Sequence, residues 1–276
     1  MEIERFKRII QYSRENKRTI DSKVQKFCSQ LGIDSEKSFH NLLQLVRPIL
    51  DEKKYLVMEL PFKDKEIGAI WYKNDYAGYI LLNTSLPEVN VNFALGHELY
   101  HVFYHEAETE RKIELYMNER YHEHEEELAA NLFSSILLMP EDSFKLMHKK
   151  FVAETAASTE VFHEQFTVIL KLMNYFRSPY MATLVRYCEL GLLKDNDGEL
   201  LAKLMKVTAE EIRTEFSRLW FDVRILDATK KDDFAVFCDY VKTQGENYIS
   251  EQYLNEKTVK KALENIKTLY YEIRGD

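Results

Sequence analysis

Glycine, proline and tryptophan are scarce in this sequence. Its 276 residues include 8 glycines, 5 prolines and 2 tryptophans. Glycine and proline interrupt helices more than any other residue, whereas leucine, glutamate and lysine, which are abundant here, are good helix formers. The composition therefore predicts a mainly helical chain, and the sequence shows no internal repeat or low-complexity tract.

Cysteines are also few, and long apolar runs are absent. The 3 cysteines, Cys28, Cys188 and Cys238, make neither an even set for disulfides nor a metal-binding spacing. No apolar run is long enough to cross a bilayer, and residues 1–6 lack the hydrophobic region of a signal peptide. We therefore expect a cytoplasmic protein with reduced cysteines and no membrane partner.

Basic residues are fewer than acidic residues. The sequence has 38 Lys and Arg against 46 Asp and Glu, which gives a formal net charge of −8. This balance disfavours broad nucleic-acid binding, so we do not expect direct binding of DNA or RNA, although a local basic face is compatible with it. The hydrophobic content of 45% and charged content of 30% are typical of a globular protein with one or two domains.

Residues 96–101 contain the motif around which the sequence is organised. They read GHELYH, a match to H-E-x-x-H, and the preceding residues 87–95 begin with proline and glutamate, as helix starts often do. On a helix, His97 and His101 lie one turn apart on one face and can bind the same metal ion, with Glu98 beside them. Zinc suits such a site, because it binds imidazole and carboxylate ligands and leaves one position open for water. The metal lowers the pKa of that water to about 7, and the glutamate accepts its proton.

A catalytic zinc site needs a third protein ligand, and the sequence offers several candidates downstream. These are His122, Glu123, His124, Glu125, Glu126 and Glu127. Residues 127–140 read as a second helix that a proline ends. Glu127 and Asn131 lie on one face of that helix, where a glutamate ligand and an amide that hydrogen-bonds a ligand would form a pair.

The two segments together resemble the ImmA/IrrE family of zinc metallopeptidases. Residues 78–83 and 93–101 resemble the first family motif, and the second is matched by Glu127, Ala130, Asn131, Phe133 and residues 137–140. The resemblance extends over residues 50–195. It implies His97, His101 and Glu127 as Zn2+ ligands and Glu98 as the general base.

The sequence departs from the family pattern at two positions. Tyr100 stands where the family often has glycine, and we expect it to face away from the histidines and to change packing alone. Ala129 stands where many members carry a second glutamate. The alanine removes a rival ligand and so favours Glu127.

The resemblance also implies an activity and a substrate. It implies a zinc-dependent endopeptidase that cleaves a protein, often a helix-turn-helix repressor of a mobile genetic element or a stress response, and so regulates transcription. Sites made of two histidines and one carboxylate accept several divalent metals, so manganese and iron remain open.

We expect an α+β, mostly helical fold. A small three-stranded antiparallel sheet, with strands at 55–60, 67–72 and 79–82, would pack on a zincin-like H-E-x-x-H helix and be flanked by helical bundles. Ser35 is a candidate N-cap for a helix through residue 46. The predicted parts are an N-terminal helical region at 1–53, an ImmA/IrrE-like zinc peptidase domain at 54–194 and a C-terminal helical domain at 195–276.

Strand 79–82 precedes the metal-site helix. In thermolysin-like peptidases the corresponding strand pairs with the extended substrate. By that resemblance, residues 79–82 would be a substrate-binding sheet edge, and an ordinary covered strand is the alternative.

Other interpretations remain open. The helical mass around a small peptidase core also fits a regulatory module that acts by binding protein or DNA on a zincin fold.

Residues 159–191 resemble a helix-turn-helix in outline, but Arg186 is the only central basic residue of the second helix, which favours packing. His122 or His124 is a candidate for stabilising the oxyanion, and a solvated segment is the alternative. The oligomeric state is not predicted.

Overall fold

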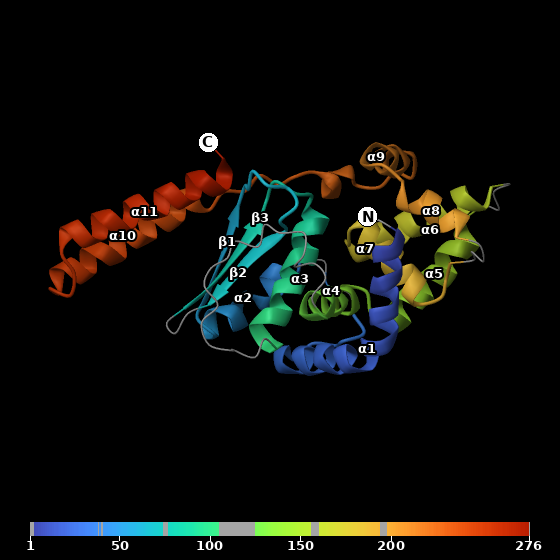
Figure 1. Ribbon diagram of the computed structural model, residues 1–276, viewed down its shortest axis with the longest axis horizontal. Helices are drawn as coiled ribbons and strands as arrows, with labels where there is room; N and C mark the ends of the chain where they lie inside the picture. The colour runs from blue at the N-terminus through green and yellow to red at the C-terminus, as the bar shows by residue number, and fades with distance from the viewer. Residues whose placement is uncertain are drawn as a thin grey trace. The chain divides into compact units, whose positions relative to one another are not determined.

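The computed structural model describes residues 3–37, 39, 41–73, 77–104, 125–155, 160–193 and 198–275 (Figure 1). The chain divides into two compact units, each made of two separate segments. Unit 1 consists of Met1–Ile49 and Asn92–Leu226, and unit 2 consists of Leu50–Val91 and Asp227–Asp276. The domain boundaries predicted at 53 and 194 stay a prediction.

Unit 1 is built from helices. In chain order they are α1 (Ile3–Leu31), α2 (Leu42–Glu52), α3 (Glu88–Tyr104), α4 (Glu125–Leu138), α5 (Glu141–Glu154), α6 (Val161–Phe176), α7 (Tyr180–Glu189), α8 (Glu199–Met205), α9 (Ala209–Arg218) and the 3-10 helix η2 (Val223–Leu226). The ends of α2 and α3 extend into unit 2. α1 packs along α4, while α6 packs on both α5 and α7 (Figure 1).

Helix α4 lies in the middle of this core. Every residue from Leu128 to Leu138 except Asn131 is buried. Phe133 of α4 packs edge-on against Phe27 of α1, with ring centroids 5.6 Å apart. A helix that is buried on nearly all sides belongs in an interior, and here the one residue of the stretch that is not buried, Asn131, faces His97.

Unit 2 combines a sheet with two helices. Its elements are β1 (Tyr55–Leu60), β2 (Ala69–Lys73), β3 (Gly78–Asn83), α10 (Phe234–Ser250) and α11 (Glu256–Arg274). Met58, Leu60 and Phe62 form a buried cluster with Tyr270 of α11. The C-terminal helices therefore complete the core of a sheet that lies far earlier in the sequence.

The structure confirms the α+β, mostly helical class but shows that the sheet is mixed. The strand order is β1-β3-β2, with β3 antiparallel to β2 and parallel to β1. The prediction of an antiparallel sheet is therefore wrong for the β1–β3 pair. β3 occupies the centre, where it pairs on both sides, so residues 79–82 form a covered strand, which was the alternative to a substrate-binding sheet edge.

A buried asparagine joins the end of the central strand to the β1–β2 connection. Asn83, at the end of β3, is fully buried. Its side-chain oxygen accepts hydrogen bonds from the backbone N–H groups of Phe62 and Ser85, and its amide donates to the carbonyls of Asp64 and Ile67. Three of these bonds tie the β1–β2 connection to the end of β3.

Within the described ranges, none of the helices is both long enough and apolar enough to cross a membrane.

Candidate metal centre

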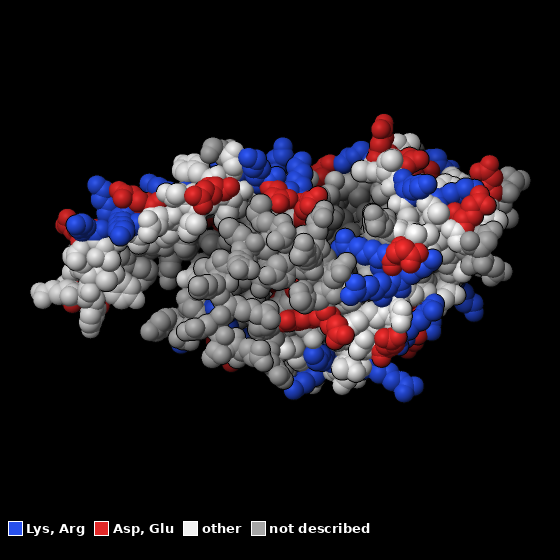
Figure 2. Space-filling model, viewed as in Figure 1, with Lys and Arg blue, Asp and Glu red and all other residues white. Residues whose placement is uncertain are grey.

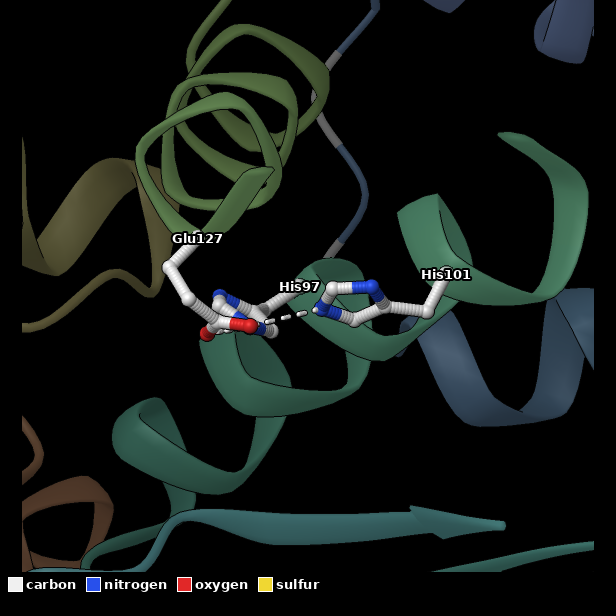
Figure 3. Close-up of side chains that lie close together, drawn as sticks. All are labelled: His97, His101 and Glu127. Carbon is white, nitrogen blue, oxygen red and sulfur yellow. Dashed lines mark hydrogen bonds and ion pairs between the residues drawn. The ribbon is translucent and has the colours of Figure 1, made fainter. Parts of the chain in front are cut away.

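Helices α3 and α4 bring three potential metal ligands together. His97 and His101 lie one turn apart on α3, and Glu127 lies in the first turn of α4 (Figure 3). One ligand atom from each lies within 4.8 Å of the other two. The motif helix predicted from residue 87 onward and the second helix predicted near residue 127 are both present.

The three donor groups are closely spaced. The Nε2 atoms of His97 and His101 lie 3.2 Å apart. The Glu127 carboxylate lies 3.1 Å from His97 Nε2 and 3.5 Å from His101 Nε2. Tetrahedral zinc with bonds of about 2.0–2.1 Å separates its ligand atoms by about 3.3–3.4 Å. The donor set and its spacing therefore fit a tetrahedral divalent metal, to which these residues would supply three of the four ligands.

The outer nitrogen of each histidine ring faces an oxygen atom. His97 Nδ1 lies 3.1 Å from Asn131 Oδ1, and His101 Nδ1 lies 3.3 Å from Glu126 Oε1. A ring that donates its Nδ1–H to such an oxygen leaves the Nε2 lone pair for a metal. The spacing of Asn131 to Glu127 predicted that Asn131 hydrogen-bonds a metal ligand. Glu126 was predicted only as a possible ligand.

The electrostatics of the cluster favour positive charge. Burial opposes protonation of His97, but its hydrogen bond to Glu127, the charges of Glu98 and Glu127 and the contact with Asn131 raise its pKa to about 9. Burial also opposes ionisation of Glu127, yet the two histidines lower the pKa of this carboxyl. The side chains thus attract a cation to the space between them.

Glu98 is the buried acid of the motif. The residue is 8% exposed. Burial raises the pKa of its carboxyl, the charges of His97 and His101 lower it, and the charge of Glu127 raises it again, with a net increase. A carboxylate with a raised pKa accepts a proton more readily at neutral pH, as a general base must.

The close approach of α3 and α4 depends on Gly96. A Cβ atom at this position would lie 2.4 Å from Ser134 Oγ and 3.2 Å from Ser134 Cβ. The Ser134 hydroxyl donates to the carbonyl of Phe93 at 2.8 Å, which fixes α4 against the turn before the motif. The glycine therefore lets the helix with the histidines reach the helix with Glu127.

Tyr100 packs between helices, as predicted, but it does not face away from both histidines as we expected, because its ring lies against that of His101. Its hydroxyl accepts a hydrogen bond from Lys23 Nζ of α1 at 2.9 Å, and its ring contacts Phe133 of α4 with centroids 5.8 Å apart. The bulkier residue thus fills space between helices.

Some candidates lie elsewhere. Glu125 is exposed at the start of α4 and does not join the cluster. His122, Glu123 and His124 lie outside the described residues, so their predicted roles stay predictions.

The candidate helix-turn-helix packs into unit 1. Arg186 of α7 is 1% exposed, donates to the carbonyl of Met139 and pairs with Glu189. It is therefore not available to a DNA phosphate. On the face seen in Figure 2, acidic and basic side chains are mixed over the region of α1. Within α1, Lys7 pairs with Glu4 at 3.1 Å.

Comparison with known proteins supplies the family. The peptidase M78 family model, described as the IrrE N-terminal-like domain, matches residues 50–187, which are half of the chain. Neither a search of curated proteins nor a search of solved structures found a match. The matched segment contains the whole cluster of His97, His101 and Glu127. The chain therefore belongs to the ImmA/IrrE family of metallopeptidases, whose model is the IrrE N-terminal-like domain.

Proposed function

We propose that this chain is a zinc-dependent endopeptidase, with His97, His101 and Glu127 as metal ligands and Glu98 as the general base. The observation that carries the proposal is the meeting of two imidazoles and one carboxylate, which approach one another to between 3.1 and 3.5 Å, beside the buried carboxylate of Glu98. The family match supports a peptidase, and the donor set supports a metal ion.

The residues divide the work of peptide hydrolysis. A bound zinc ion would supply positive charge that acidifies water and polarises the scissile carbonyl. Glu98 accepts the proton of the attacking water and passes it to the leaving amine. Asn131 holds His97 so that its Nε2 atom stays directed at Glu127 and His101.

Three finer parts of the proposal rest on the family resemblance and the composition. The substrate is a DNA-binding repressor of a mobile element or a stress response, and its cleavage releases transcription. The resident metal is zinc, as the family resemblance implies, and the two imidazoles and one carboxylate are ligands that zinc accepts. The protein acts in the cytoplasm, as predicted from its 3 scattered cysteines.

A peptide library tests the proposed activity without knowledge of the substrate. The zinc-loaded chain is incubated with an amino-blocked, proteome-derived peptide library, and new amino termini are identified by mass spectrometry. We expect cleavage at internal bonds by the wild type and by Glu125→Gln. Glu98→Gln should bind zinc equally well and cleave at least about 100-fold more slowly, because proton transfer by a positioned side chain is worth that much.

Two outcomes would contradict this proposal. Cleavage that survives in Glu98→Gln would assign the general base elsewhere. A folded, zinc-loaded wild type that cleaves no peptide would favour the alternative of a regulatory binding module on a zincin fold.

A further inference from the structure

The two histidines of the cluster are oriented by different chemistry. His97 faces the neutral amide of Asn131 and His101 faces the carboxylate of Glu126, in both cases through Nδ1. A glutamate next to the Glu127 ligand would ordinarily count as a rival ligand. The geometry instead gives it a separate task.

Helical geometry separates the two glutamates. Successive residues on a helix point about 100° apart, and Glu126 and Glu127 approach the His101 ring at different nitrogen atoms. Glu127 lies against the Nε2 atoms of both histidines, whereas Glu126 lies against the opposite side of the His101 ring, 3.3 Å from Nδ1. The His101 side chain is 9% exposed and that of Glu126 33%, so the carboxylate covers the outer side of a buried ring.

We infer that Glu126 is a positioning residue that holds His101 in the tautomer required for metal binding. With its proton on Nδ1 and donated to Glu126, His101 presents a free Nε2 lone pair. Without this acceptor, the ring can carry its proton on Nε2, where the proton competes with the metal, and the ring can also rotate. The inference rests on the proposed metal site and adds a residue to it.

The proposal requires an acceptor oxygen at position 126, which a matched set of variants can test. Zinc affinity is measured for the full chain by competition with a chromophoric chelator. Glu126→Ala should bind zinc about 10- to 100-fold more weakly, as is typical when such a partner of a ligand is lost. Glu126→Gln, which keeps an acceptor oxygen, should recover most of the affinity. Glu125→Ala, which removes an exposed charge from the same helical turn, should stay within about twofold of the wild type.

Substitution of cobalt for zinc provides a second readout, because the visible spectrum of Co2+ reports its ligands. We expect the same spectrum for the wild type and Glu126→Ala, since the ligands themselves are unchanged. A changed spectrum would make Glu126 a ligand and overturn the inference. Equal zinc affinity of Glu126→Ala and the wild type, equal weakening by Glu125→Ala, or failure of Glu126→Gln to recover affinity would also overturn it. A wild type that binds no zinc would instead overturn the proposed metal site itself.

Discussion

Glu141, the first residue of α5, shows how neighbouring charges act on a single side chain. It pairs with Lys17 of α1 and with Lys145 one turn along α5, the latter at 2.5 Å. Burial opposes ionisation of this carboxyl, but the two lysines lower its pKa to about 2. The pair with Lys17 joins residues 124 positions apart, so it ties α1 to α5.

This shift predicts a pH-dependent contribution to stability. Because the pKa of Glu141 is lower in the folded than in the unfolded chain, its contribution is complete above the unfolded value of about 4.3 and is lost as the pH falls towards 2. Glu141→Gln should reduce the free energy of unfolding by on the order of 1 kcal/mol at pH 7, a modest amount because solvent screens these partly exposed partners. Urea unfolding at pH 7, 5, 4 and 3 measures the difference.

The comparison variant is Glu154→Gln, which removes an exposed partner of Lys150 at 3.8 Å. It should change the free energy of unfolding by less than about 0.5 kcal/mol at any of these pH values. A difference between Glu141→Gln and the wild type that does not shrink below pH 4 would show that the ion pairs are not its cause.

At the scale of residues, the sequence predicted the contacts that depend on one helix. The spacing of His97 and His101 places both on one face of any helix, and Asn131 follows from Glu127 in the same way. Glu127 itself could be chosen from its neighbours only through the family resemblance. The contact of Glu126 with His101 could not be predicted, because it depends on how α4 is rotated against α3.

At the scale of elements, the contact between α3 and α4 is the one on which the metal site depends. Gly96→Ala should weaken zinc binding and reduce the free energy of unfolding by about 1–3 kcal/mol, because the added methyl group overlaps Ser134. Chelator competition and urea unfolding measure the two effects. The double variant Gly96→Ala with Ser134→Gly should recover part of both, since it removes the atoms that the methyl group meets.

Ser134→Gly alone serves as the control for this pair. If the losses of zinc affinity and stability in the double variant equal the sums of the losses in the two single variants, the two positions act independently. The close contact with Ser134 would then not be the reason that position 96 requires glycine.

Helix and strand positions were predictable where local signals dominate. Thr208 forms a capping box with Glu211 at the start of α9, which is a pattern of local sequence. Ser35 does not begin a helix: Asn41 accepts a hydrogen bond from the N–H of Gln44, and α2 starts at Leu42. The strand order was missed because turn residues predict where a strand ends but not which strand becomes its neighbour.

At the scale of the whole molecule, segments far apart in sequence share a core. Tyr270 of α11 is 6% exposed, stacks on Phe234 with centroids 3.6 Å apart and donates a hydrogen bond to Asp232 at 2.5 Å. It belongs to the same buried cluster as Met58 and Leu60 of β1. The division into two units thus predicts that loss of the Tyr270 side chain destabilises unit 2 and leaves the stability of unit 1 nearly unchanged.

Tyr270→Ala tests this division. Loss of a large buried aromatic side chain should reduce the free energy of unfolding of unit 2 by about 3–5 kcal/mol. Hydrogen exchange should speed up in residues 55–83 and 234–274 and change little in α4. Tyr271→Ala, at a neighbouring residue that is 48% exposed, is the control. Equal acceleration in α4 would show that both units unfold as one.

The central claim is that His97, His101 and Glu127 bind one catalytic metal ion, and metal content tests it most directly. Wild type and Glu127→Ala are purified side by side, incubated with zinc and separated from the unbound zinc. Their metal content is then measured by inductively coupled plasma mass spectrometry. We predict one zinc ion per chain in the wild type and a marked loss in Glu127→Ala, with both chains folded by circular dichroism. A folded wild type that retains no zinc would contradict the metal centre and the peptidase mechanism together.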